Sequence, residues 1–154
     1  MKLLALNVYF FLATTCPISQ QYTAYINQFT RMAAEKHIQV MLVFPTEKNK
    51  IKTEVDRFIQ QYKLSAPVMI DKGFKLSKKF NATVTPEVFV LNEKDQVLYH
   101  GAIDNWFYKL GQNRIEITEH YLDDAVGQAL NQQPIIRPYV KPIGCFIETG
   151  MPSN

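Results

Sequence analysis

Short apolar runs alternate with segments of helical periodicity in the first half of this chain, and that alternation limits the possible folds most. Runs typical of buried strands cover 3–13, 38–44 and 67–70. Segments 18–33 and 51–62 lie between them, and their apolar residues recur at helical spacing, which predicts helices with one core-facing stripe. The order strand, helix, strand, helix, strand predicts an α/β fold with parallel strands and right-handed crossovers.

The pattern changes in the second half. A brief helix is expected over 74–80, and strands 85–91 and 97–101 flank a short polar turn, which predicts an antiparallel hairpin. Thr118 is expected to cap a last helix, whose inner face lies within 122–130. Together these elements predict a central mixed β-sheet flanked by helices.

The length and composition favour one domain. The chain has 154 residues, of which 47% are hydrophobic, and this is enough to bury a core without disulfides or metal. We expect that domain to cover 1–133. Segment 134–154 has no periodicity and is rich in proline, which predicts an extended tail docked on the same domain. Its prolines are Pro134, Pro138, Pro142 and Pro152.

Charge and hydropathy argue against two classes of partner. The formal net charge is +3, and the lysines are interspersed with acids, as on an ordinary solvated surface, so nucleic-acid binding is not expected. No apolar run reaches the roughly 18 residues of a membrane span. Segment 1–6 resembles a signal peptide, but Asn7 interrupts it and no cleavage motif follows, so we interpret it as part of the first strand. The compartment stays open: extracytoplasmic, such as periplasmic, if a leader has been removed, and cytoplasmic otherwise.

The chain has two cysteines, Cys16 and Cys145, too few for a disulfide scaffold or a cysteine-rich zinc site. Cys16 lies where the first apolar run ends and Pro17 begins a helix. The free N–H groups at a helix N-terminus favour a thiolate and lower the thiol pKa from about 8.5. Since the thiolate is the reactive form, Cys16 is the strongest candidate for a nucleophile. The alternative is a cysteine that only fills space in the core.

In two segments the chain resembles the thioredoxin-like redoxins, a superfamily that includes thiol-disulfide oxidoreductases and proteins like alkyl hydroperoxide reductase. The first segment is 10–19, Phe-Phe-Leu-Ala-Thr-Thr-Cys-Pro-Ile-Ser, at the junction of strand and helix. The second is 84–87, Val-Thr-Pro-Glu, at the start of a strand. The final hairpin and helix also match in order. The resemblance implies a thioredoxin fold.

The resemblance also implies roles for individual residues. Cys16 would be the nucleophile, with Ser19 in place of a second cysteine and Pro86 in the cis form opposite them. Pro17, Ser19, Thr85 and Pro86 would contact the substrate, and the backbone of Thr85 would pair with an extended partner. The implied partner is a protein or small molecule carrying a thiol or disulfide. No organic cofactor is implied.

Ser19 departs from the two-cysteine pattern of the family. A serine hydroxyl is too weak an acid to displace a mixed disulfide, so Cys16 needs another resolving thiol. Cys145 is one candidate, because an extended tail from Pro134 would reach roughly 30 Å at about 3.1 Å per residue. An external thiol is the other. Cys145 could instead be a small hydrophobic residue in a docked tail.

Other departures from the family pattern reduce the number of reactions that we expect of Cys16. Peroxidatic redoxins have proline and threonine where this chain has Tyr9 and Ala13, so peroxide reduction is disfavoured. The tryptophan that precedes a thioredoxin cysteine is replaced by Thr15, and Phe10 stands near the place of the buried acid. Glu87 could serve as the proton acceptor instead, if it is desolvated near Cys16. Otherwise it is a solvated glutamate at a strand edge.

The competing interpretation is a redox-inactive thioredoxin-like module that binds a partner or a metal. A metal site could combine Cys16, Cys145 and His100, although no histidine pair has helical ligand spacing. The other histidines, His37 and His120, are expected at helix ends. The aromatic run that includes Trp106 is either a packed lid over the sheet or a surface for docking a partner.

Overall fold

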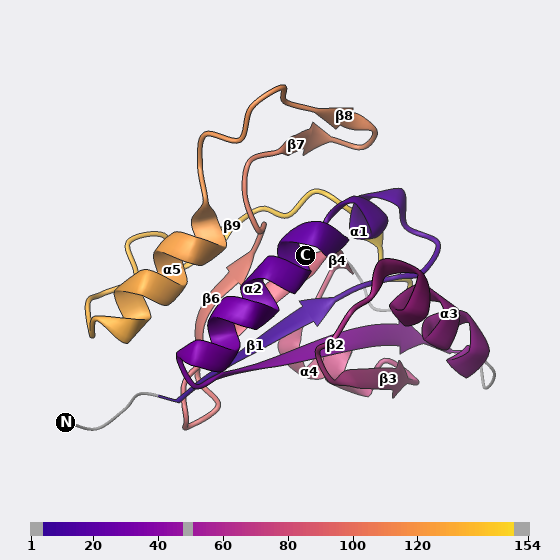
Figure 1. The fold of residues 1–154 in the computed structure, drawn as a ribbon, viewed down its shortest axis with the longest axis horizontal. Coiled ribbons are helices and arrows are strands. Elements are labelled where there is room, and N and C mark those ends of the chain that lie inside the picture. The colour runs from indigo at the N-terminus through magenta and orange to yellow at the C-terminus, as the bar shows by residue number, and fades with distance from the viewer. Residues whose placement is uncertain (1–4, 48–50, 150–154) are drawn as a thin grey trace.

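The apolar runs of the first half form the centre of a six-stranded sheet in the computed structural model, which describes residues 5–47 and 51–149 (Figure 1). Residues 3 and 4 of the expected first strand lie outside these residues. The strand order is β3-β2-β1-β5-β6-β9, in which β1, β2 and β3 are parallel, β5 is antiparallel to both β1 and β6, and β9 is parallel to β6. The predicted mixed sheet is confirmed. Its strands are β1 (Leu6–Phe11), β2 (Ile38–Thr46), β3 (Val68–Lys72), β5 (Glu87–Leu91), β6 (Val97–Gly101) and β9 (Tyr139–Val140).

The side chains of β1 explain why this strand lies at the centre of the sheet. Successive side chains of a strand point to opposite faces. Phe10 therefore packs in the larger hydrophobic core and Phe11 in a smaller one behind the sheet, and neither ring is exposed. Burial on both faces is what an uninterrupted apolar run favours.

The helices cover both faces of the sheet, and the core to which each helix contributes shows which face it covers. The larger core takes apolar residues from α1, α2, α3 and α5, whereas α4 covers the smaller core with Leu76 and Phe80. The helices are α1 (Pro17–Gln21), α2 (Thr23–Glu35), α3 (Lys52–Tyr62), α4 (Lys75–Phe80) and α5 (Tyr121–Leu130). Among the described residues, no helix is long and apolar enough to cross a membrane.

Two helix predictions differ from the structure in detail. The helix expected over 18–33 is interrupted at Tyr22, although backbone hydrogen bonds to Ile18 and from Ile26 keep α1 and α2 in continuity. The capping role predicted for Thr118 is wrong, because α5 begins at Tyr121. Thr118 instead accepts a hydrogen bond from the side-chain amide of Asn105, at 2.7 Å, which ties the loop before α5 to the loop after β6.

A small hairpin, β7 (Phe107–Lys109) and β8 (Gln112–Asn113), extends away from the body of the molecule and has no counterpart among the sequence predictions (Figure 1). Such short strands leave no period-two pattern to detect. Trp106 stands at the base of this hairpin, with its ring 5.5 Å from that of Tyr22. Trp106 thus packs on the residue that joins α1 to α2.

Residues 134–149 of the tail run extended along the domain and form two very short strands (Figure 1). β9 adds to the edge of β6, and β10 (Cys145–Phe146) pairs antiparallel with β4 (Val84–Thr85). The tail thus connects the outer edge of the sheet with the segment just before β5.

Candidate active site

Cys16 lies where the sequence predicts it, between the end of β1 and the first turn of α1. Its backbone is extended, with φ of −85° and ψ of 115°, and its carbonyl oxygen accepts a hydrogen bond from the Gln20 N–H at 3.1 Å. Cys16 is therefore the N-cap residue of α1, and Pro17 is the first helical residue, where its missing N–H is no disadvantage. The side chain of Cys16 is only 1% exposed.

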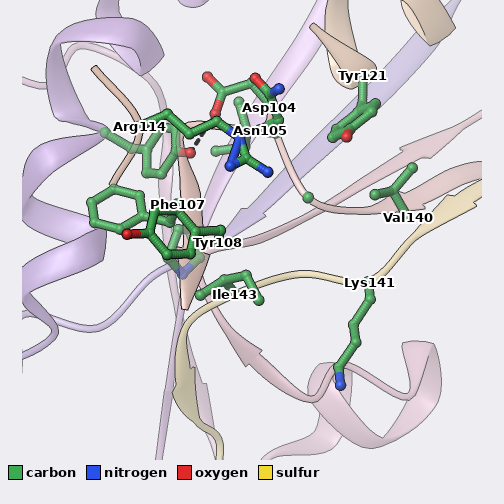
Figure 2. A pocket seen from close by; sticks show the side chains of 13 residues that line it. Asp104, Asn105, Phe107, Tyr108, Arg114, Tyr121, Val140, Lys141 and Ile143 are labelled. Atoms are coloured by element: carbon green, nitrogen blue, oxygen red, sulfur yellow. Dashed lines mark hydrogen bonds between the residues drawn. The ribbon is translucent and has the colours of Figure 1, made fainter. Parts of the chain in front are cut away.

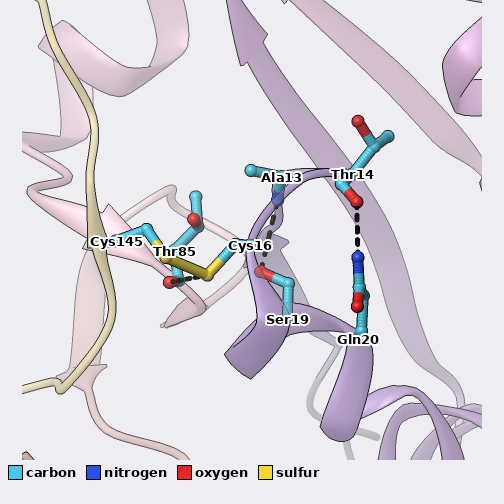
Figure 3. The surroundings of a disulfide bond; sticks show 7 residues. All are labelled: Ala13, Thr14, Cys16, Ser19, Gln20, Thr85 and Cys145. Carbon is cyan, nitrogen blue, oxygen red and sulfur yellow. Dashed lines mark hydrogen bonds between the residues drawn. A yellow bond between two sulfur atoms is a disulfide. The ribbon is translucent and has the colours of Figure 1, made fainter. Parts of the chain in front are cut away.

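The two cysteines of the chain form a disulfide bond, although 129 positions separate them (Figure 3). Their Cα atoms are 6.1 Å apart, within the usual range for a disulfide. Cys145 is partly exposed, in contrast to the buried Cys16. Cys145 is thus the more exposed of the two residues.

The peptide bond between Thr85 and Pro86 is cis, as the family resemblance implies. The carbonyl oxygen of Thr85 lies 3.2 Å from the sulfur of Cys16, and both residues are buried. The disulfide, the cis proline and the start of α1 thus meet at one place (Figure 3).

The backbone of Thr85 is already paired within the chain. Cys145 is its partner in the register of β10 with β4, and Phe146 is opposite Val84. The Ile147 N–H continues the pairing with a hydrogen bond of 2.9 Å to the carbonyl oxygen of Thr83. The tail therefore occupies the edge at which the family resemblance implies an extended partner.

Two glycines allow the tail to approach this closely. A Cβ atom on Gly144 would collide with the carbonyl group of Thr85, and one on Gly101 would collide with the carbonyl group of Val140. Gly101 also has a φ of 129°, which side chains rarely permit. Each glycine thus lies where the tail touches the domain backbone to backbone.

Ser19 supports the loop that carries Cys16. Its side chain is fully buried, and its hydroxyl oxygen accepts a hydrogen bond from the Ala13 N–H at 3.3 Å. The Gln20 side-chain amide donates to the carbonyl oxygen of Thr14 at 2.9 Å (Figure 3). Both bonds join the first turn of α1 to the chain that enters it.

Glu87 is buried, but its carboxylate is engaged away from the sulfurs. Oε1 accepts hydrogen bonds from the backbone and hydroxyl of Thr83, and Oε2 lies 3.2 Å from Nδ1 of His100. By strand alternation its side chain shares the sheet face of Phe89, which packs in the smaller core, whereas Cys16 packs in the larger one. A role of Glu87 in proton transfer to Cys16 stays a prediction.

A cavity of about 210 Å³ is lined by Pro86, the residue of the cis peptide bond, and by Ile143 of the tail; Figure 2 shows Ile143 at its wall. Asp104 lines it and accepts hydrogen bonds from the Tyr22 hydroxyl, at 2.5 Å, and the Trp106 N–H, at 2.9 Å. Burial raises the pKa of the Asp104 carboxyl, and it also raises the pKa of Tyr22, with the nearby Asp104 adding to that effect. Sequence reasoning missed Asp104, because only the fold brings it to this cavity.

The histidines are not grouped with the cysteines. Within the described residues no three His, Cys, Asp or Glu side chains are arranged to hold a metal ion. His100 pairs with Glu87 and stacks on Phe89, with ring centroids 5.2 Å apart. His37 lies just after α2, and His120 is the N-cap residue of α5.

Comparisons with known proteins agree with this geometry. A family model described as Redoxin matches residues 6–105. No curated protein matches the chain. An uncharacterized conserved protein from Geobacillus kaustophilus is similar in structure, with a TM-score of 0.80 and 19% identity over 97% of this chain and 79% of its own.

Two further solved structures identify the fold. A thioredoxin-like protein solved in its oxidised form has a TM-score of 0.63 and 14% identity, over 84% of this chain and 80% of its own. A secreted disulfide oxidoreductase of Mycobacterium tuberculosis has a TM-score of 0.52 and 12% identity, over 60% of this chain and 65% of its own. The fold of this chain is therefore thioredoxin-like, as predicted.

Proposed function

Because the chain belongs to the Redoxin family, we propose that it is a thiol-disulfide oxidoreductase whose redox couple is Cys16 and Cys145. Its substrates are disulfides of proteins or small molecules. The observation that supports this most is the bond between the two sulfurs beside a cis proline. A disulfide buried in a structural role needs neither the N-cap position of Cys16 nor the partly exposed position of Cys145.

In the reducing direction, β10 first leaves β4 and uncovers Cys16, whose thiolate then attacks one sulfur of the partner's disulfide. A bond forms between Cys16 and that sulfur, and the partner's other sulfur leaves as a thiolate. The thiolate of Cys145 then attacks the sulfur of Cys16 and releases the partner's first sulfur as a second thiolate. The partner is reduced by two electrons, and the protein keeps the Cys16–Cys145 disulfide.

The return step takes place at the other sulfur. Because Cys16 is buried and Cys145 is partly exposed, a reducing thiolate attacks Cys145 and forms a mixed disulfide with it. Cys16 leaves as the thiolate. A second reducing thiol then releases Cys145, and the dithiol form is restored. The substrate and the reductant thus form their mixed disulfides with different cysteines.

The remaining site residues have supporting roles in this proposal. Pro17, which is exposed, contacts the substrate together with Thr85 and Pro86. The substrate contact predicted for Ser19 is replaced by a supporting role, because this side chain is fully buried and holds the loop of Cys16 through the Ala13 N–H. We assign these functions to a domain of residues 1–133 with a docked tail of residues 134–154, which supplies Cys145.

The proposal is tested by allowing the reduced protein to react with a small aromatic disulfide that releases a coloured thiol. The unaltered chain is expected to release coloured thiol from both steps and to end as the Cys16–Cys145 disulfide, identified by mass spectrometry. Cys145→Ser removes the resolving thiol, so this variant is expected to stop at a mixed disulfide on Cys16.

Cys16→Ser is the matched control, since it keeps Cys145 and the same number of thiols. It is expected to react more slowly than Cys145→Ser when both are reduced, because its remaining thiol lacks the N-cap position. If Cys16 in the Cys145→Ser variant does not react, the oxidoreductase proposal is wrong, and the redox-inactive module is favoured instead.

A further inference from the structure

The edge of β4 is held by β10, and the way β10 binds indicates what else can bind there. β10 pairs antiparallel with β4, with Cys145 opposite Thr85 and its sulfur bonded to Cys16. A mixed disulfide between Cys16 and an extended partner has the same covalent linkage as this one. Two strands cannot pair with one edge at the same time, so the tail and such a partner exclude each other.

The residue that precedes the cysteine in the bound strand has no space for a side chain. Gly144 lies against the Thr85–Pro86 peptide group, where an added Cβ would collide with the Thr85 carbonyl group. That group is backbone at a buried position beside the cis proline, so it cannot move aside as a flexible side chain can. A strand bound in the register of β10 therefore needs glycine at this position.

The residue two positions before the cysteine packs against the larger hydrophobic core. This residue, Ile143, is partly buried, and it also lines the cavity, whose wall includes the apolar Phe107 and the polar Asp104 (Figure 2). The residue after the cysteine meets no such limit, because Phe146 is 77% exposed. The three positions that flank the cysteine of the bound strand thus differ in the side chains that they accept.

On the basis of the proposed function, we infer that a peptide segment which pairs with the β4 edge in the register of β10 must carry the pattern aliphatic residue, glycine, cysteine. The tail carries this pattern at 143–145 and is the competitor built into the chain. Partners whose cysteine follows a larger residue are excluded from this register, whereas small disulfides without a peptide strand are not subject to the limit.

The test uses the full-length Cys145→Ser variant in its reduced form and a synthetic peptide of residues 141–149. The peptide cysteine is first joined to thionitrobenzoate as a mixed disulfide. Attack by the Cys16 thiolate on the peptide sulfur forms the Cys16–peptide disulfide and releases thionitrobenzoate, whose absorbance gives the rate. The peptide must displace the variant's own tail, and every peptide tested faces that same competitor.

Two altered peptides serve as matched controls. The peptide with Gly144→Ala is expected to react at least about tenfold more slowly than the native peptide, because the collision weakens strand pairing. The peptide with Phe146→Ala is expected to react at nearly the native rate, since that side chain contacts solvent. Each rate is compared with the rate at which the same variant reacts with the small aromatic disulfide, which carries no peptide.

The outcomes separate this inference from the function on which it rests. Equal rates for the native and Gly144→Ala peptides, with normal reaction of the small disulfide, would overturn the inference and leave the proposed function intact. If Cys16 does not react even with the small disulfide, both fail. A slow alanine peptide beside a normal Phe146→Ala peptide supports the inference.

Discussion

The tail is attached to the domain at two places that differ in kind. At β9 the contact is between main chains: the His100 N–H donates to the carbonyl oxygen of Pro138 at 3.1 Å, and the Ala102 N–H to that of Val140 at 3.0 Å. At β10 a similar strand pairing is joined by the disulfide. Only the second attachment has a covalent component. If the disulfide is reduced, as the proposed function requires, we expect the hydrogen bonds of β9 to keep Cys145 near Cys16.

Breaking the covalent attachment is expected to have the largest effect. The disulfide joins residues 129 positions apart, for which chain entropy gives an upper value of roughly 5 kcal/mol of stability. The β9 attachment already restricts the tail, so the measured loss is expected to be smaller. Urea unfolding with and without reductant measures it, and Cys145→Ser, which has no disulfide to lose, is the control. An unchanged unfolding midpoint on reduction would contradict this prediction.

The attachment at β9 is tested by Gly101→Ala. The added Cβ collides with the Val140 carbonyl group at a φ unfavourable for alanine, so we expect a loss of about 2–4 kcal/mol in both redox states. Gly127→Ala in α5 is the matched control, because its Cβ would meet open space and alanine favours a helix by about 1 kcal/mol. Equal unfolding free energies for the two variants would show that β9 contributes nothing.

Gly144→Ala tests the attachment at β10 and is expected to cost about 1–3 kcal/mol. Because the change weakens only the docked tail, it appears as a shift of the thiol-disulfide equilibrium toward the dithiol by roughly tenfold or more, measured in a glutathione buffer. In the reduced protein, amide hydrogen exchange is expected to rise at Ile147 and to stay unchanged at Ala102. A rise at both amides would mean that the two attachments are not independent.

The smallest effect is expected from Asp104, which lines the cavity between the two attachments. Burial raises its pKa above the ordinary 3.8, which means that the fold favours the protonated carboxyl. The stabilisation is therefore complete below the ordinary value and is lost as the pH rises through the raised pKa. Asp104→Asn is expected to remove this loss, as measured by unfolding free energies between about pH 3 and pH 7. Parallel pH profiles for the variant and the unaltered chain would contradict the prediction.

The sequence predicts the domain better than the tail, and the reason is physical. Strands such as β1 and helices such as α3 are long enough to carry a hydrophobic period, so their order can be inferred from residues alone. The cis form of Pro86 follows from the resemblance and is confirmed. β9 and β10 are each two residues long and are defined by their partners, so no local pattern predicts them.

Prediction of the candidate site from the sequence is limited in the same way, because local signals can be found and long-range contacts cannot. The position of Cys16 follows from local signals, namely the end of an apolar run and a proline that begins a helix. The pairing of Cys16 with Cys145 depends on the direction in which the tail runs. That direction is set in part by the backbone contact at Gly101, which is far from the cysteine in the sequence. The hydrogen bonds of Glu87 depend on which sheet face it occupies, and the sequence interpretation did not address that.

The two glycine contacts have an evolutionary consequence. The main chains approach closely at Gly101 and Gly144, while the side chains of Tyr139 and Phe146 are 52% and 77% exposed. Mutation can therefore replace these exposed side chains without disturbing how the tail is held. We expect descendants of a common ancestor to keep the two glycines and the two cysteines while the exposed positions of the tail diverge, so that such a tail is recognised by these four residues and not by percentage identity.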